Sequence, residues 1–253
     1  IRPFDKASDG SLPGEGAAAL VVKRLDAAVK NRDRIYAVIE SVGAAGKGSA
    51  MPVSSDTYVQ SLECAFDPDR TGSAFPGLIE THGCGHPARD AAEAAALNRF
   101  FADAGARAKT KAALGSTKPV IGETGAASGL ASVIKTALCL YQEIIPPLSN
   151  YKTPGQVWEE AFFHMPKFAQ YWIRNRTGGP RKALAGSMTR DGQCYHARLS
   201  EAPHPEGRFH IQGGPAAVVP ADNPAASDHL HKQITKERKK PAGWSPTGLF
   251  VVC

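Results

Sequence analysis

Residues 77–105 read GLIETHGCGHPARDAAEAAALNRFFADAG and place a strand, a loop and a helix in one stretch. The apolar segment 77–81 has the length of a buried strand, and it runs into a loop rich in glycine and histidine. Asp90, with Glu93 three residues later, predicts a capping box at the start of a helix. One face of that helix carries apolar side chains at helical spacing, namely Ala94, Leu97 and Phe101.

The same alternation of strands and helices continues on both sides of this stretch. Apolar or β-branched segments predict further strands at 17–22, 35–42 and 112–116, and a pair within 183–199 around a turn at 189–193. Helices are expected over 26–31 and over 130–142, where an apolar stripe consists of Leu130, Ile134, Leu138 and Tyr141. This alternation predicts an α/β fold, in which ligands bind at loops that follow strand ends.

The composition excludes several classes of protein. The 253 residues are 42% apolar and 21% charged, which is ordinary for a globular chain. No apolar run is long enough to span a bilayer, and no signal peptide is recognisable at the N-terminus. The five cysteines are odd in number, lie far apart and include no CxxC pair, so neither a disulfide framework nor a thiolate zinc site is indicated. We therefore expect a cytoplasmic protein that does not contact the membrane.

The net charge of +6 comes mainly from one segment of the chain. Residues 1–150 carry equal numbers of basic and acidic side chains, whereas the segment 167–198 has seven basic residues against Asp191. Such a face suits an acidic partner, or it is simply a solvated surface. No nucleic-acid-binding motif accompanies the charges, so no nucleic acid partner is expected. After residue 201 the alternation of predicted strands and helices ends. This predicts a domain over 1–201 and a linker or disordered tail over 202–253.

Three segments carry residues suited to chemistry. They are the opening Arg2-Pro3-Phe4-Asp5 with Gly14-Glu15-Gly16, the loop Glu80-Thr81-His82-Gly83-Cys84-Gly85-His86-Pro87, and Gly115-Ser116-Thr117-Lys118-Pro119-Val120-Ile121-Gly122-Glu123-Thr124. In this order and spacing the chain resembles the β-ketoacyl synthases of polyketide and polyunsaturated fatty-acid synthases, over about residues 1–201.

The resemblance implies the C-terminal half of a thiolase-like fold, a five-layer αβαβα arrangement that is incomplete here at the N-terminus. In the family, the nucleophilic cysteine lies upstream of the Arg-Pro-Phe-Asp segment, and none of the five cysteines stands in its motif. Family members are acyltransferases that use an acyl carrier protein. Its phosphopantetheine arm delivers the substrate, and no other cofactor is implied. The expected partners are the carrier protein and a ketosynthase-type protein, in a homodimer or heterodimer.

The resemblance also assigns roles to individual residues. His82 would be the first of two histidines that hold the malonyl thioester oxygen, and Lys118 would support the site electrostatically. Glu123 stands where the family has its second histidine. Cys84 replaces a usual threonine, and with His86 and Thr124 it would contact the substrate. Because an ionised carboxylate cannot donate a hydrogen bond and repels a growing oxyanion, the sequence predicts a catalytically impaired relative that resembles a chain-length factor.

Other interpretations stay open from the residues alone. The chain could be part of an active ketosynthase whose nucleophile lies upstream. Glu123 could pair with Lys118 as an ion pair, which is compatible with lost catalysis. The third alternative is a small metal-binding module at His82, Cys84 and His86, because alternate residues of an extended segment face the same side. It lacks a fourth ligand nearby in the sequence, and no metal is expected.

Overall fold

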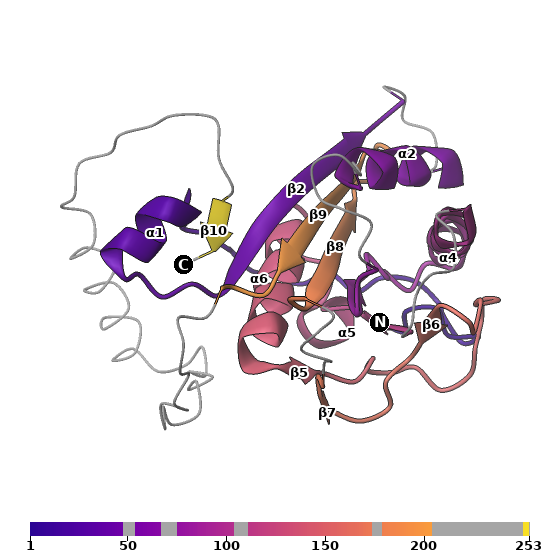
Figure 1. Cartoon of the computed structure of the whole chain (residues 1–253). Coiled ribbons are helices and arrows are strands. Elements are labelled where there is room, and N and C mark those ends of the chain that lie inside the picture. Colours follow the sequence, from indigo (N-terminus) through magenta and orange to yellow (C-terminus); the bar gives the residue numbers. More distant parts are fainter. Residues whose placement is uncertain (48–53, 67–74, 104–110, 174–178, 204–249, 253) are drawn as a thin grey trace, which may run out of the picture. The chain divides into compact units, whose positions relative to one another are not determined.

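The computed structural model describes residues 1–47, 54–66, 75–103, 111–173, 179–203 and 250–252 (Figure 1). The helices are α1 (Leu25–Asn31), α2 (Ser55–Ala65), α4 (Pro87–Asp103), α5 (Lys118–Ile121) and α6 (Ala127–Gln142). The strands are β1 (Val22–Arg24), β2 (Ala37–Ala45), β3 (Leu78–Glu80), β4 (Ala112–Gly115), β5 (Ile144–Ile145), β6 (Phe163–His164), β7 (Gln170–Tyr171), β8 (Lys182–Met188), β9 (Cys194–Ser200) and β10 (Phe250–Val252).

The main sheet mixes two kinds of pairing, in the order β1-β10-β2-β9-β8-β3-β4-β6. Strands β8, β3, β4 and β6 are parallel, whereas β1, β10, β2, β9 and β8 pair antiparallel. Parallel strands end at the same edge of a sheet, so the loops after β3 and β4 come together there. These loops carry His82 and Lys118.

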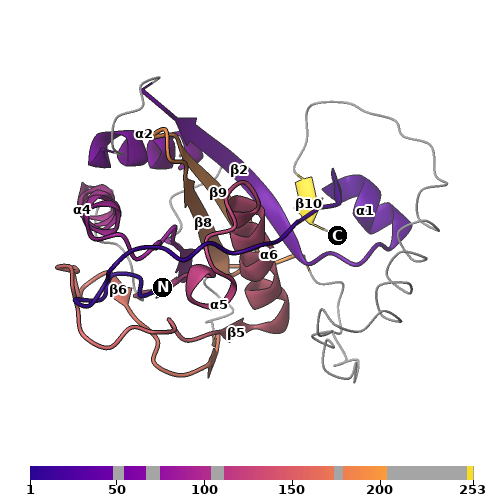
Figure 2. The ribbon, with the colours of Figure 1, turned by 180° about the vertical axis from the view of Figure 1, so that it is seen from behind.

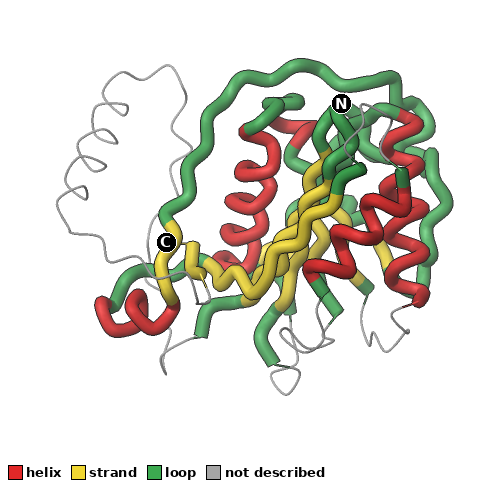
Figure 3. The backbone as a smooth tube through the Cα atoms, turned by 90° about the horizontal axis from the view of Figure 1, so that it is seen from above, coloured by secondary structure: helices red, strands yellow, loops and turns green. Residues whose placement is uncertain are grey.

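Helices cover both faces of the sheet, with α6 on one side and α2 and α4 on the other (Figure 3). Neighbouring residues of one strand serve opposite faces, because side chains alternate along a strand. Ile79 belongs to the core cluster that contains Tyr58, Leu97 and Phe101 of α2 and α4. Leu78 belongs to the cluster that contains Ala137 and Leu140 of α6. The layers are therefore helix, sheet, helix, as in the predicted α/β fold.

Apart from Leu140, helix α6 buries small side chains, and it exposes part of several larger ones. Its buried residues are Ser128, Ser132, Thr136, Ala137, Cys139 and Leu140. The apolar stripe expected from the sequence is not this face, because Leu130 and Leu138 are 37% and 41% exposed. Small side chains let the helix lie close to the sheet, as at Gly129, where an added Cβ would be 3.3 Å from Ser187 Oγ.

Several predicted elements are confirmed, two expectations are wrong, and one helix is not predicted. The strands expected at 35–42, 77–81 and 112–116, the pair within 183–199, and the helices expected over 26–31 and 130–142 form close to the expected bounds. The strand expected at 17–22 is largely absent, because Ala17, Ala19 and Val21 are exposed and β1 begins only at Val22. Helix α4 begins at Pro87, so Asp90 is not its cap. The sequence pattern does not predict helix α2, since polar residues interrupt its apolar face.

The N-terminal segment passes beside α5 before it reaches α1 (Figure 2). There the backbone of residues 12–14 pairs with Glu123. Glu123 N donates to Leu12 O at 2.8 Å, and Gly14 N donates to Glu123 O at 3.0 Å. A Cβ at Gly14 would lie 2.1 Å from Ile121 O, so the two segments approach more closely than a side chain permits. This contact explains the first glycine of the Gly14-Glu15-Gly16 motif.

The predicted tail at 202–253 falls outside the described residues, apart from residues 202–203 and strand β10. The domain boundary at 201 therefore stays a prediction. Among the helices of the described ranges, none has the length and apolar character needed to cross a bilayer.

Candidate active site

Two buried carboxylates of α4 hold the loop that follows β3. Asp90 Oδ1 accepts from Cys84 N at 3.1 Å and from Gly85 N at 3.2 Å. Glu93 accepts from His82 N at 2.8 Å and from Gly83 N at 2.9 Å. Four consecutive backbone amides are thus fixed by two side chains one helical turn apart. This is the role of the pair that the sequence suggests as a capping box.

Glu93 also connects the loop to α2. Tyr58, which is fully buried, donates its hydroxyl to Glu93 Oε1 at 2.8 Å. Asp90 accepts a further backbone hydrogen bond from Phe4 N at 2.7 Å, which ties in the N-terminal segment. The position of His82 therefore depends on three segments that are far apart in the sequence.

The ring of His82 is held as a neutral donor. Met188 N donates to its Nδ1 at 3.2 Å, and Lys118 Nζ lies 3.1 Å from the same nitrogen. Because Nδ1 accepts, the proton of the neutral ring lies on Nε2. Burial, together with the charges of Lys118 and Arg89, holds the pKa of His82 well below its usual range. His82 Nε2 is buried and has no hydrogen-bond partner among the described residues.

Glu123 lies next to His82 and Lys118, as the sequence predicts. Its Oε2 is 3.6 Å from Lys118 Nζ and 3.9 Å from His82 Nε2. Its Oε1 accepts from Ser128 Oγ at 2.7 Å and from Gly125 N at 3.2 Å. Lys118 Nζ also donates to the backbone oxygen of His82 at 2.6 Å, so the lysine supports both the loop and the carboxylate.

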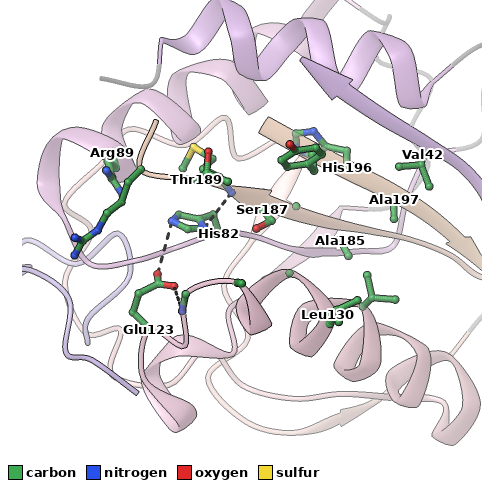
Figure 4. A pocket seen from close by; sticks show the side chains of 18 of the residues that line it. Val42, His82, Arg89, Glu123, Leu130, Ala185, Ser187, Thr189, His196 and Ala197 are labelled. Atoms are coloured by element: carbon green, nitrogen blue, oxygen red, sulfur yellow. Dashed lines mark hydrogen bonds and ion pairs between the residues drawn. The ribbon is translucent and has the colours of Figure 1, made fainter. Parts of the chain in front are cut away.

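A cavity of about 1030 Å³ lies beside these residues (Figure 4). Its polar end includes His82, Glu123 and Arg89. Its apolar walls come from α6, the sheet face and the N-terminal segment, namely Leu20, Ile39, Val42, Leu130, Val133, Ala185 and Ala197. Ser187 and His196 also line the cavity, so its walls are apolar only in part. The apolar part suits a ligand with an apolar segment.

The residues predicted to contact substrate lie in different surroundings. His86 lines the cavity and is exposed. Cys84 and Thr124 are not among the lining residues. Cys84 is buried with its Sγ 3.7 Å from Asp90 Oδ1, and burial together with that carboxylate raises the pKa of its thiol to about 11. Thr124 Oγ1 lies 3.1 Å from Ser128 Oγ.

The structure does not form the metal site considered from the sequence. Within the described ranges, no three histidine, cysteine, aspartate or glutamate side chains are arranged to hold a metal ion. His82 faces Met188 and Lys118, whereas Cys84 faces Asp90, so the alternate residues of the loop do not share one ligand position.

Some site residues escape prediction from the sequence. Ser128 donates to Glu123, and the backbone N–H of Met188 donates to the His82 ring. Nothing in the sequence around either residue indicates these contacts. The role of Glu93 could be detected in the sequence. Its carboxylate lies on the same helix face as buried alanines, and a buried carboxylate must be paired.

Glu93 is expected to make the stability of the chain fall as pH rises. Burial raises the pKa of Glu93 from 4.5 to about 7, although Gly83 N and the Tyr58 hydroxyl act in the opposite direction. Since the folded state holds this proton more tightly than the unfolded chain, its contribution is complete below pH 4.5 and is lost as pH rises through about 7. The free energy of unfolding of the wild type minus that of E93Q should therefore decline over this range in urea titrations. A difference independent of pH would contradict this assignment.

Comparisons with known proteins agree with this geometry. Residues 36–152 match the family model described as the C-terminal domain of β-ketoacyl synthase. The chain is 32% identical over 206 residues to polyketide synthase PksL of Bacillus subtilis, with 79% of the chain aligned. It is 32% identical over 235 residues to one of the subunits of the polyunsaturated fatty acid synthase of Thraustochytrium, with 89% aligned.

Solved ketosynthases have the same fold. Ketosynthase twelve of the bacillaene synthase of Bacillus amyloliquefaciens superposes with a TM-score of 0.74 at 26% identity, over 80% of this chain and 37% of that one. The PfaC ketosynthase–chain length factor gives 0.68 at 28% identity, over 82% of this chain and 22% of that one. The chain spans only 4% and 8% of the two synthase chains named above. It belongs to the β-ketoacyl synthase family, as the C-terminal part of a thiolase-like condensing domain.

Proposed function

We propose that this chain acts as a ketosynthase-like partner, similar to a chain-length factor, and that it catalyses neither condensation nor malonyl decarboxylation by itself. The observation that carries the proposal is the Glu123 carboxylate, whose Oε2 lies 3.9 Å from His82 Nε2 beside the cavity. In the family, a second histidine at this position helps to hold the thioester oxygen.

Decarboxylation places negative charge on that oxygen, and donors must be aimed at it. His82 keeps such a donor at Nε2. Glu123, which accepts from Ser128 and Gly125, has none to offer and adds a negative charge beside the reacting group. Loss of one oxyanion donor costs about 10²–10³ in rate, and the added charge increases that cost.

Partners and substrate carrier follow from the same proposal. A carrier protein would bring an acyl group on its phosphopantetheine arm, and the apolar walls of the cavity suit an acyl chain. A ketosynthase-type partner would supply the catalysis, in a homodimer or heterodimer. The basic segment 167–198 suits an acidic carrier protein, although residues 174–178 lie outside the described ranges.

The second candidate is part of an active ketosynthase. The observation that favours it is the Nε2–H of His82, which the surrounding contacts hold ready to donate. In that case Glu123 acts as a protonated donor, and the nucleophile comes from another part of the protein.

Release of CO₂ from malonyl carrier protein tests the proposal. The wild-type chain should give no release above background, and E123H should give at least about 10² more because a second donor is present. Glu63→His, at an exposed position of α2, makes the same exchange away from the cavity and should give no gain. Decarboxylation by the wild-type chain would overturn the proposal, and an inactive, folded E123H would show that Glu123 is not the cause.

A further inference from the structure

The carboxylate of Glu123 is surrounded by donors from three segments. Ser128 Oγ and Gly125 N donate to Oε1, at 2.7 and 3.2 Å. Lys118 Nζ and His82 Nε2 lie 3.6 and 3.9 Å from Oε2. A cation, a hydroxyl, a backbone N–H and a ring N–H around one planar anion form a set that suits carboxylates in general.

The inner donors are held in place without Glu123. Lys118 Nζ donates to the backbone oxygen of His82 at 2.6 Å, and the His82 ring accepts from Met188 N at 3.2 Å. The His82 backbone is in turn fixed by Glu93 at 2.8 Å. The arrangement of the two donors therefore does not depend on the side chain at position 123.

Glu123 is the outermost member of this group. Its side chain is 24% exposed, whereas the side chains of Lys118 and His82 are each 2% exposed. It lines the cavity, and Figure 4 shows its carboxylate next to the His82 ring. Without it, the buried ammonium of Lys118 would lose the carboxylate that lies 3.6 Å away, which is costly in a protein interior.

We propose that Glu123 is an internal ligand, which occupies a carboxylate-binding site made by His82, Lys118, Ser128 and the backbone N–H of Gly125. The inference rests on the same placement of Glu123 as the proposed function, and it names the class of ligand that the site takes. Removal of this side chain leaves a hole beside Lys118 and His82, which are held without it, and a small carboxylate from solution fills it. The wild-type chain resists such ligands because its own carboxylate is already bound.

Acetate is the probe, and NMR of the His82 ring is the measurement. E123A should show a saturable shift of the His82 Nε2 and Cε1 signals, with a Kd of about 1 mM, or about −4 kcal/mol. The wild type should show none. E123Q should show none either, because its amide still fills the site. E123A combined with K118M should lose the response, and E63A should behave as the wild type. Chloride at matched ionic strength serves as the ion control.

E123S is prepared beside E123A, so that a folding defect in one variant leaves the other for the titration. A folded E123A or E123S that does not respond to acetate would overturn the inference. So would a wild type that responds as strongly as E123A, or failure of both variants to fold, since the remaining donors are argued to hold without Glu123. Decarboxylation by the wild-type chain would instead contradict the proposed function and leave the acetate result standing.

Discussion

Alanine in place of Glu93 is expected to lower the free energy of unfolding by about 3 kcal/mol at about pH 6, because each buried donor left without a partner costs at least about 1 kcal/mol and three are left. The carboxyl group of Glu93 accepts from the backbone N–H groups of His82 and Gly83 and from the hydroxyl of Tyr58. All four residues are buried.

Urea unfolding, followed by circular dichroism, measures this loss. The matched control is Glu63→Ala, which removes a carboxylate from an exposed position of α2 and should change the free energy of unfolding by less than about 0.5 kcal/mol. The His82 ring signals should also move in E93A and remain unchanged in E63A, because Glu93 fixes the backbone that carries the ring. Equal stability of E93A and E63A would mean that water replaces the carboxylate.

Alanine at Gly14 is expected to destabilise the chain by about 2–3 kcal/mol, because overpacking against backbone atoms cannot be relieved by a rotamer change. The added Cβ would lie 2.1 Å from Ile121 O and 2.9 Å from Gly122 Cα. The backbone of residues 121–123 must move away, and it carries Glu123 with it. We therefore expect G14A to disturb the contact between Glu123 and His82 as well.

Gly16→Ala is the matched control from the same motif. Its added Cβ would lie 3.6 Å from Thr124 Cγ2, an ordinary contact. Thermal unfolding of the two variants measures the loss of stability. The His82 ring signals report separately on the contact between Glu123 and His82. A G14A variant as stable as G16A would mean that the two segments are not in close contact.

The motif residues can be predicted from the sequence, but the residues that hold them in position cannot. The resemblance places His82, Lys118 and Glu123 in one site, and the structure brings them within 4 Å of one another. The capping role predicted for Glu93 is wrong because a carboxylate three residues after an aspartate fits a capping box equally well, and local spacing does not show that the helix starts at Pro87.

The misplaced elements have a similar cause. Residues 17–22 are apolar enough for a buried strand, yet they cross the outside of α5 and α6, where no neighbouring strand of the described chain receives residues 17–21 (Figure 2). Helix α2 carries Thr57, Ser61 and Glu63 between its apolar residues, and its buried hydroxyls find partners that only the folded chain supplies. Ser61 Oγ, for example, lies 2.7 Å from Nδ1 of His196 in β9.

The mostly small side chains on the buried face of α6 have a consequence for how this chain tolerates sequence change. Ser132 and Thr136 are buried on the face of α6 that contacts the sheet. Adding a few methyl groups at either position displaces the helix from the sheet, even though the exchange makes the sequence more apolar. A polar replacement at Leu138, which is 41% exposed, meets solvent and is accommodated. Along this helix, hydropathy is therefore a misleading guide to which mutations the isolated chain survives, and side-chain volume is the better one.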